Sequence, residues 1–406
     1  MRARRVSVPS LLDDPGVRRA QSPGRRFLFA VPPFGDLAPA TAVAAELVRR
    51  GDKVAWTGHR ATLEPKLRPG SRVFDAVEAD AGERLDRVRS DGRDLRGVAA
   101  VRLLWEDLLV PLGHAMAPGV EKAIERFRPH VVVADQLALA APVAARRRDL
   151  PWATVAATSA EFSRPLAALP KVEQWVRDRI AGFLLDHGVD DLFDPRFSER
   201  LVLVFTAAGL IGDVTVFPGH VAFVGPVAGR AAPRPFPWER LDGRPAVLVT
   251  PGAAAGTSGD RFLRAAAEAV RDLDVQAVVE THPGVLPDPP PNVLVVDRVP
   301  HHRLMERLSA VVCHGAHDTV CAALSHGLPL VVAPVRDDQP AIARQVEAAG
   351  AGLTVRCARP RPDELRTALT TVLNEDAYRA AAGRIRDSIN ASGGVAEAAD
   401  RLEKLA

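Results

Sequence analysis

Short apolar runs alternate with more polar segments along most of the chain. In the first half, runs at 26–31, 53–58, 130–135 and 151–157 each have the length of one strand, and their mostly apolar residues are typical of strands buried on both faces of a sheet. A helix pattern at 40–51 lies between the first two runs and ends at a glycine. This order of strand, loop, helix and strand predicts a parallel sheet with right-handed crossovers.

The alternation stops at 226–245, which is rich in proline, glycine and arginine, and then restarts. Strands are expected at 246–250, 276–281, 292–297, 310–314 and 329–334, with helices that include 259–272 and 319–327. In the first half, 81–96 is polar and irregular, which predicts a mobile loop, and a helix is expected at 97–127. The chain therefore has the pattern of two similar α/β units without close sequence repeats.

A length of 406 residues fits two domains better than one core. We divide the chain into a disordered N-terminal extension (1–24), a first domain (25–228), a linker (229–243), a second domain (244–385) and a C-terminal helix that crosses back to the first domain (386–406). The extension is basic but has no apolar stretch of the kind found in signal peptides.

The composition narrows the class of protein. Apolar residues make up 47% and charged residues 25%, as in globular proteins, and the net charge of +3 with no basic stripe of interleaved aromatics argues against nucleic acid as a partner. Three cysteines do not suggest a disulfide framework and fit a reducing cytoplasm. No apolar run has the length of a membrane span. We expect a cytoplasmic protein, a monomer or homodimer without integral membrane contact, and the heavy use of Ala, Arg, Val and Pro suggests a bacterial source.

Ligands of parallel α/β sheets bind beyond the carboxyl ends of the strands, so two such domains would bind between their facing loops. The stretch VVCHGAHDTV at 311–320 ends a buried strand at His314, passes through Gly315 and Ala316, and starts a helix near Asp318 and Thr319. A helix start binds anions, small residues admit a phosphate, and His314 has a nitrogen to donate. The same residues also fit a helix capped by Asp318 with an ordinary strand-end histidine.

Cysteines and histidines in this stretch raise the possibility of zinc. Cys313, His314, His317 and Cys321 are close in sequence, but strand neighbours Cys313 and His314 point to opposite faces, and there is no CxxC pair. We therefore expect no metal site here.

Two further loops follow strands of the second domain. VRDDQP at 335–340 places Asp338 beside Gln339, a carboxylate and an amide suited to vicinal hydroxyls, although one aspartate can cap the next helix. PGAAAGTSG at 251–259 is glycine-rich but has neither the lysine of a P-loop nor the GxGxxG spacing. Its Thr257 and Ser258 can bind a diphosphate, or Ser258 can cap the helix.

Two carboxylates of the first domain follow strands of the same sheet. Asp36 lies in the loop after the first strand, and Asp135 ends the strand at 130–135. If they face one another, repulsion and partial burial raise one pKa and make that carboxylate a general base. Asp36 also precedes a helix closely enough to cap it.

Taken in order, HGAHDT (314–319), GLPLVVAP (327–334), DDQP (337–340) and GAG (350–352) resemble the donor-binding signature of the bacterial natural-product glycosyltransferases. These antibiotic- and macrolide-type enzymes belong to the nucleotide-sugar-dependent GT-B group. FVGPV (223–227) and RVPHHRLMERLSAVVCH (298–314) agree as well, and the outline covers about 25–390, with the first half matching in pattern rather than detail.

The resemblance implies a GT-B fold, with two Rossmann-like domains facing across a cleft. It also implies inverting transfer of a sugar or deoxysugar from a dTDP- or UDP-sugar co-substrate to a hydrophobic natural product. It implies a hexosyltransferase type of enzyme with no obligatory cofactor or metal. The acceptor belongs to the first domain and the donor to the second. The resemblance assigns donor contacts to Gly252, Thr257, Ser258, Val299, His314, Gly315, Ala316, Asp318, Thr319, Asp338 and Gln339, and acceptor contacts to Pro33, Phe34 and Leu37.

The sequence departs from the family at several positions. Ala316 replaces a glycine, and Asp318 stands where glycine or asparagine is usual. Many relatives have a catalytic histidine in the first loop, whereas this chain has Asp36, so the catalytic pair becomes Asp36 and Asp135. Asp36 is then the base for O-transfer, or the acceptor is a phenol or is attacked at carbon, or the protein is a GT-B-like non-glycosylating enzyme, binding protein or activator.

Overall fold

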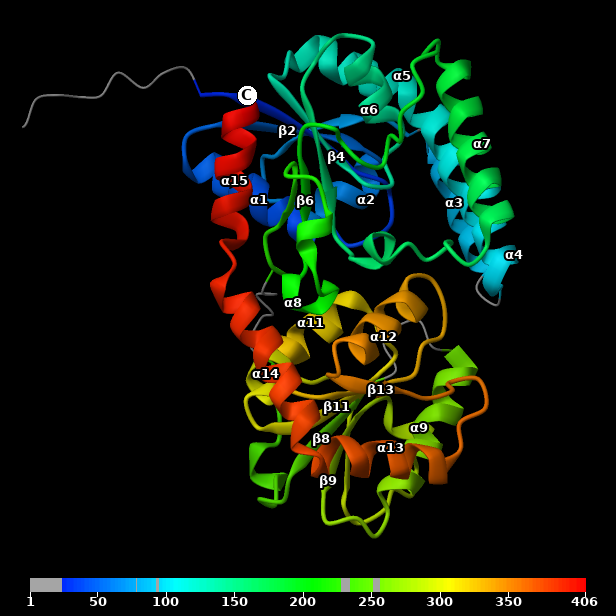
Figure 1. Ribbon diagram of the computed structural model, residues 1–406, viewed down its shortest axis with the longest axis vertical. Coiled ribbons are helices and arrows are strands. Elements are labelled where there is room, and N and C mark those ends of the chain that lie inside the picture. The colour runs from blue at the N-terminus through cyan, green and yellow to red at the C-terminus, as the bar shows by residue number, and fades with distance from the viewer. Residues whose placement is uncertain (1–23, 78, 93–94, 228–233, 251–255) are drawn as a thin grey trace, which may run out of the picture.

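The computed structural model describes residues 24–406 except 78, 93–94, 228–233 and 251–255. The predicted N-terminal extension and part of the predicted linker lie outside the described residues. The rest forms two α/β units, one above the other in Figure 1, each built around a parallel sheet.

The first sheet has seven strands in the order β3-β2-β1-β4-β5-β6-β7. Residues Phe27 to Ala30 of β1 are fully buried, with Phe27 and Phe29 packing into one apolar layer and Leu28 and Ala30 into the layer on the opposite face. Both faces are covered, which explains the unbroken apolar runs. The strands are β1 (Arg26–Ala30), β2 (Lys53–Gly58), β3 (Arg72–Asp75), β4 (Val131–Asp135), β5 (Trp152–Ala156), β6 (Val202–Val204) and β7 (Val221–Phe223).

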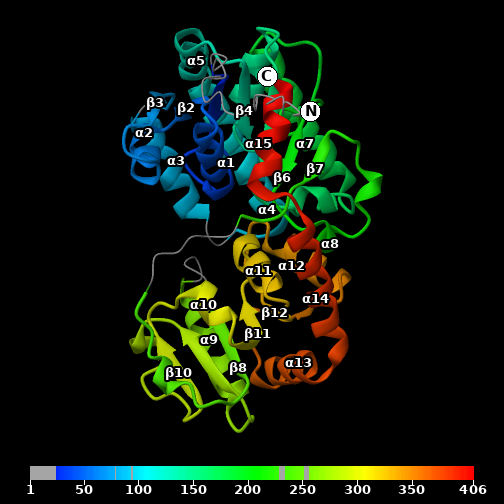
Figure 2. The same ribbon diagram turned by 90° about the vertical axis from the view of Figure 1, so that its left-hand side faces the viewer.

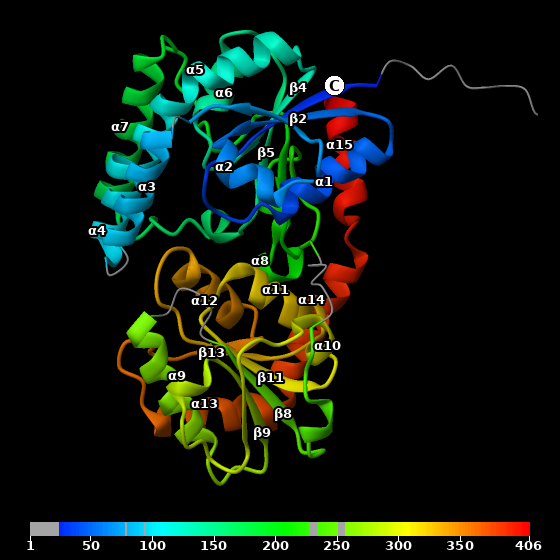
Figure 3. The same cartoon turned by 180° about the vertical axis from the view of Figure 1, so that it is seen from behind.

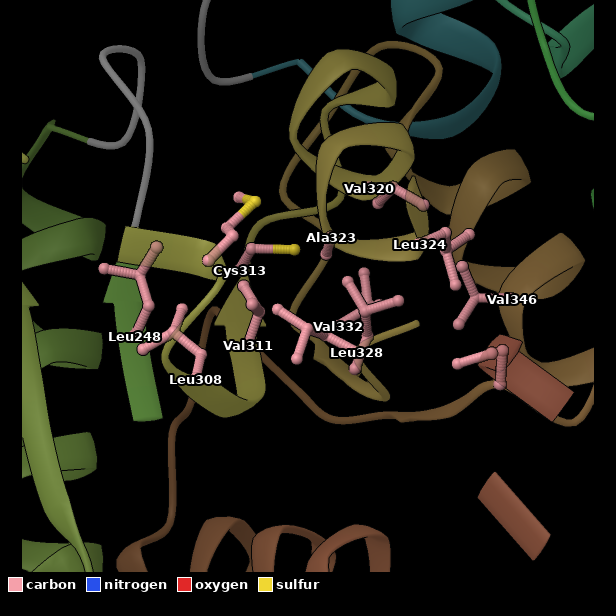
Figure 4. Close-up of a cluster of buried hydrophobic side chains, with 14 of the residues drawn as sticks. Leu248, Leu308, Val311, Cys313, Val320, Ala323, Leu324, Leu328, Val332 and Val346 are labelled. Atoms are coloured by element: carbon pink, nitrogen blue, oxygen red, sulfur yellow. The ribbon is translucent and has the colours of Figure 1, made fainter. Parts of the chain in front are cut away.

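The second sheet has six strands in the order β10-β9-β8-β11-β12-β13. Its strands are β8 (Ala246–Thr250), β9 (Gln276–Glu280), β10 (Val293–Val296), β11 (Leu308–Cys313), β12 (Leu330–Val332) and β13 (Gly352–Thr354). Figure 4 shows one side of this core, where Val311 and Cys313 of β11 point to the same apolar layer as Val320 and Leu324. The predicted parallel α/β class is therefore confirmed for both units.

Helices cover both faces of the two sheets. Those of the first unit are α1 (Ala38–Arg49), α2 (Arg60–Leu63), α3 (Ala79–Asp91), α4 (Gly97–Arg102), α5 (Val110–Phe127), α6 (Ala140–Arg146), α7 (Pro170–Asp186) and α8 (Ala208–Ile211). Those of the second unit and the C-terminus are α9 (Gly256–Val270), α10 (His301–Met305), α11 (His317–Ser325), α12 (Gln339–Ala348), α13 (Pro362–Asn374), α14 (Asp376–Ala391) and α15 (Gly394–Leu405). In the turned view of Figure 2, α8 of the first unit lies over α14, and it also contacts α12.

The segment at 81–96 corrects one prediction. We expected a mobile loop, but residues up to Asp91 belong to α3, because Leu85 and Val88, three residues apart, pack against the core of the first unit. The helix expected at 97–127 is present and contains a π-helical stretch, Leu103–Leu109, between α4 and α5. The structure has no described helix that is long and apolar enough to cross a membrane.

The C-terminal helix α15 returns to the first unit. Ala398, Ala399 and Leu402 are fully buried in the layer that also contains Phe27 and Val43. The helix lies beside α1 in Figures 1 and 3, where Arg50 forms ion pairs with Asp400 and Glu403. The two units are therefore joined by α14 and α15 as well as by the linker.

We predict that Leu402→Ala lowers the free energy of unfolding by about 2–5 kcal/mol, since it empties a fully buried site between α15 and α1. Urea unfolding followed by circular dichroism measures this change. Leu405→Ala, which truncates a half-buried leucine of the same helix, is the control and should cost less. Equal losses in the two variants would contradict this packing.

Candidate active site

Loops at the carboxyl ends of both sheets meet at the interface of the two units. The Thr158 hydroxyl, after β5, donates to the Asp338 carboxylate at 2.6 Å, and Ser159 donates to the Gln345 side chain of α12, also at 2.6 Å. His317 Nε2 lies 3.0 Å from the Thr206 hydroxyl, after β6. The candidate donor loops are thus fixed directly against the first unit.

His314 follows β11 and has one nitrogen free for a ligand. Its residue is 9% exposed, its ring hydrogen-bonds to the backbone of Thr250 at the end of β8, and its buried Nδ1 has no partner among the described residues. Burial is the largest effect and lowers the pKa of His314; the Asp318 charge and the hydrogen bond to Thr250 oppose it, and the nearby Arg336 charge adds to it. The ring is therefore neutral near pH 7 and offers an unused polar atom at the start of α11.

The backbone beside His314 leaves the start of α11 without a side-chain cap. Gly315 has φ +88°, and a Cβ there would lie 2.7 Å from Val332 Cγ1, so this position requires glycine. Ala316 occupies the N-cap position of α11, and its side chain makes no capping hydrogen bond. The helix start keeps backbone N–H groups available, which is the arrangement that binds phosphates.

Asp318 and Thr319 lie inside the first turn of α11. Asp318 Oδ1 accepts the Thr319 N–H at 2.7 Å, so the carboxylate occupies one donor of the helix start without being its N-cap. The residue is exposed, and its charge raises the pKa of Asp36 across the interface and that of Asp338 in the next loop. Asp318 therefore sits where its negative charge acts on both sets of loops.

His317 and the cysteines are parts of the packed interior. Cys321 Sγ lies 3.4 Å from His317 Nε2, and burial lowers the pKa of His317 to about 4. Burial also raises the pKa values of Cys313 and Cys321 to about 12, so both are neutral thiols in this structure. His317 is a neutral link between the units.

The loop after β12 holds Asp338 and Gln339 in different ways. Gln339 Oε1 accepts the N–H groups of Val335 and Arg336 at 2.8 and 3.1 Å, so this oxygen fixes the loop. The Asp338 carboxylate does not cap α12 and instead accepts from Thr158. Burial raises the pKa of Asp338, and the Thr158 hydrogen bond opposes this effect.

Asp36 lies in the loop after β1 and Asp135 ends the neighbouring strand β4, and the two carboxylates interact electrostatically. Asp36 Oδ1 accepts the Ala38 N–H at 2.9 Å. Desolvation by the surrounding protein raises the pKa of Asp36, and the Ala38 hydrogen bond opposes this shift. Asp135 is buried, its Oδ1 accepts the Leu137 N–H at 2.9 Å, and burial raises its pKa to about 7, with the Asp36 charge adding to the shift. One carboxylate is therefore poised to hold a proton near neutral pH while the other is ionised.

Two residues near these groups were not predicted. Gln136, directly after Asp135, is 4% exposed, and its Nε2 has no partner among the described residues. The side chain of Arg336 is mostly buried, and its Nε lies 3.4 Å from the Asp337 carboxylate. In the sequence, Gln136 is a polar residue directly after a buried strand and Arg336 begins the stretch RDDQ. Neither residue can be assigned to the site from the sequence, because the sequence does not show the direction of the side chain.

The remaining candidate acceptor- and donor-binding residues differ in whether their side chains are exposed enough to contact a ligand. Leu37 is 7% exposed and packs into the core of the first unit, so its side chain is not available to an acceptor. Phe34 is half-buried, with the Arg89 guanidinium 4.8 Å from its ring centroid, and Pro33 beside it is also half-buried. Val299 is buried, and its N–H donates to Glu280 at 3.1 Å. Gly252 lies outside the described residues, as do the side chains of Thr257 and Ser258, which start α9.

Comparisons with known proteins agree with this architecture. Residues 263–405 match the family model of the erythromycin biosynthesis protein CIII-like C-terminal domain. The 4'-demethylrebeccamycin synthase of Lentzea aerocolonigenes is 30% identical over 420 residues, covering 94% of this chain and 100% of that protein. The demethyllactenocin mycarosyltransferase of Streptomyces fradiae is 28% identical over 399 residues, covering 93% and 85%.

Solved structures with a similar architecture identify the fold. The calicheamicin glycosyltransferase CalG4 has a TM-score of 0.76 at 24% identity, covering 94% of this chain and 98% of that one. The glycosyltransferase of kitacinnamycin has a TM-score of 0.72 at 26% identity, covering 94% and 99%. Two facing parallel-sheet units with this topology define a GT-B glycosyltransferase. The chain belongs to the family of bacterial natural-product glycosyltransferases, and it is an enzyme rather than the binding protein or activator kept open above.

The raised pKa of Asp135 predicts a pH-dependent cost to stability. Between about pH 4 and pH 7 the folded state retains a proton that the unfolded state has lost, so the free energy of unfolding falls as pH rises through this window. Asp135→Asn removes the titration and keeps an oxygen for the Leu137 N–H. We expect the variant to gain stability relative to the wild type, by a few kcal/mol at most, as pH rises through the window.

Urea unfolding at a series of pH values measures this difference. Any constant effect of the buried amide cancels in the comparison, and Asp213→Asn, an exposed aspartate that likewise accepts a backbone N–H, is the matched control. A stability difference between Asp135→Asn and wild type that stays constant with pH would exclude the raised pKa.

Proposed function

We propose that this enzyme transfers a hexose or deoxyhexose from a nucleoside diphosphate sugar to a hydrophobic, phenolic or aromatic natural product with inversion at the anomeric carbon. The observation that carries the proposal is the buried, unpartnered Nδ1 of His314 beside the uncapped start of α11. Because the other ring nitrogen donates to the Thr250 carbonyl, Nδ1 carries a lone pair in the neutral ring. The charge of a bound diphosphate would favour protonation of Nδ1, which would then donate to it, and the diphosphate would also accept from the helix N–H groups.

We assign the donor to the second unit. The diphosphate would lie against His314, Gly315 and the start of α11, with the Arg336 guanidinium as the nearby positive charge. The sugar hydroxyls would reach Asp338 and the amide nitrogen of Gln339, which the loop hydrogen bonds leave unused. The structural neighbours VinC and SpnG, 21% and 20% identical to this chain, were solved with thymidine diphosphate, which makes this nucleotide a suitable test ligand.

We assign the acceptor to the first unit. Phe34 is packed at the edge of an apolar cluster, and several other partly buried side chains border the same cluster. These are Leu104, Leu137, Leu166 and Trp175. Partly buried apolar side chains of this kind would favour an aromatic aglycone over a sugar or peptide. The neighbour SpnG was also solved with spinosyn aglycone, so a bulky apolar acceptor is compatible with the fold.

The mechanism would be a single in-line displacement. The Asp36 carboxylate takes the proton from the acceptor hydroxyl, and the acceptor oxygen forms a bond to the anomeric carbon while the bond from that carbon to the phosphate oxygen breaks. The electron pair leaves with the diphosphate, where α11 and His314 stabilise the added charge. The Asp36 charge raises the pKa of Asp135, so Asp135 would hold the proton and leave Asp36 ionised. With an aromatic carbon as nucleophile, the Asp36 carboxylate would take the proton from that carbon.

We predict that Asp36→Asn lowers kcat by about 10²–10⁴-fold, the usual contribution of a general base, while thymidine diphosphate binds with unchanged affinity. Asparagine keeps an oxygen for the Ala38 N–H, so the start of α1 is preserved. Chromatography of reactions with dTDP- or UDP-sugars and a panel of phenolic acceptors measures product formation.

Asp213→Asn is the control for this substitution, since Asp213 also accepts a backbone N–H two residues ahead. It should leave turnover unchanged. An Asp36→Asn enzyme with nearly wild-type kcat would reject Asp36 as the base, and wild-type protein that transfers from no nucleotide sugar to any acceptor of the panel would count against the proposed substrates.

A further inference from the structure

Three metal-binding side chains converge on the second unit, away from the loops described above. His302 belongs to α10, Glu306 follows that helix, and His326 directly follows α11. Each offers one ligand atom, and these atoms all lie within 4.8 Å of one another. Among the residues that the structure describes, these three side chains are close enough to one another to bind a single ion.

The spacing of the three ligands suits a small cation. His302 and Glu306 are four residues apart, which places both on one face of a helical turn. The His302 and His326 rings are already in contact, with centroids 5.2 Å apart in an edge-on arrangement. Ligand atoms of a tetrahedral zinc ion lie about 3.4 Å apart. His302 and Glu306 are exposed and His326 is half-buried, so rotation about their side-chain bonds can supply the required contraction.

A second observation fixes which nitrogen of His326 is available. His326 Nδ1 lies 2.9 Å from the Ala322 carbonyl oxygen, which can only accept, so Nδ1 carries the proton. The lone pair is then on Nε2. Metal-binding histidines characteristically donate their other N–H to a carbonyl or carboxylate in this way, which fixes both tautomer and ring orientation.

The side chains of His302 and Glu306 are not engaged in polar contacts by other described residues. Neither His302 nor Glu306 has a side-chain hydrogen bond or ion pair with another residue that the structure describes. The neighbouring cations have other contacts, because Arg303 and Arg307 stack on the Trp238 ring at 5.2 and 4.9 Å from its centroid. The Glu306 carboxylate therefore has no ion pair with a described residue and lies next to two imidazoles.

We propose that His302, Glu306 and His326 bind one divalent cation of the zinc class. Two imidazoles and one carboxylate are ligands that Zn²⁺, Co²⁺ and Ni²⁺ prefer over Mg²⁺ or Ca²⁺, and a water molecule completes the coordination. The ion joins α10 to the carboxyl end of α11, the helix whose other end begins beside His314. It acts as a structural clamp between these two helices and takes no part in sugar transfer, so the proposal is independent of the transferase mechanism.

Titration of the untagged, chelator-treated protein with ZnCl₂ by calorimetry tests the site. We expect one ion per chain with a dissociation constant in the micromolar range, and a loss of affinity of at least about tenfold in both His302→Ala and His326→Ala. Titration with CoCl₂ adds a spectroscopic readout, because visible absorption reports imidazole ligands in a four-coordinate site. His220→Ala, which removes a histidine of the first unit, is the control and should bind as the wild type does.

Thermal unfolding gives a second readout. Zinc should raise the melting temperature of the wild type and the His220→Ala control, but not that of His302→Ala or His326→Ala, and circular dichroism without metal confirms that all four proteins are folded. Absence of saturable zinc binding to the wild type would overturn the proposal. Binding that survives both histidine substitutions unchanged would overturn it equally, because the ion would then lie elsewhere.

Discussion

The structure depends on the way in which two parallel sheets turn their carboxyl ends toward one interface. Every polar loop with candidate chemistry follows a strand, so this orientation alone brings them together. The orientation is held by buried polar contacts, Thr158 with Asp338, Ser159 with Gln345 and Thr206 with His317, and by α15, which packs against α1. Because buried polar contacts require good geometry, they fix the relative position of the units better than apolar packing alone.

Electrostatics at this interface explain why an anion would bind in spite of several carboxylates. Asp318 and Asp338 lie in neighbouring donor loops, and Asp36 faces Asp318 from the first unit. Against them stand the dipole of α11, the Arg336 guanidinium near His314, and the burial that keeps Asp135 partly protonated near pH 7. A diphosphate at α11 would also raise the pKa of Asp36 through its negative charge, which would make Asp36 a stronger base when donor is present.

Much of the fold followed from the sequence, because apolar runs of strand length between turn residues are typical of strands covered on both faces. The pattern failed at α3, where the apolar spacing is confined to Leu85 and Val88 and the other residues are polar. Ordered motifs led to His314 and Gly315 because helix starts and glycine conformation are local properties. Side-chain direction is not local, which is why Leu37 was misplaced on the acceptor surface and Gln136 and Arg336 were missed. The partners of Asp338 and His317 come from the other unit and are beyond sequence patterns.

The central claim is that His314 and the start of α11 bind the diphosphate of the sugar donor. Calorimetric titration with thymidine diphosphate measures this directly, with wild type, His314→Ala and the His220→Ala control compared at one salt concentration. The account predicts that His314→Ala weakens binding by at least about tenfold, as expected for loss of a buried hydrogen bond to a charged group, and that the control binds normally. Equal affinity of His314→Ala and wild type would contradict it.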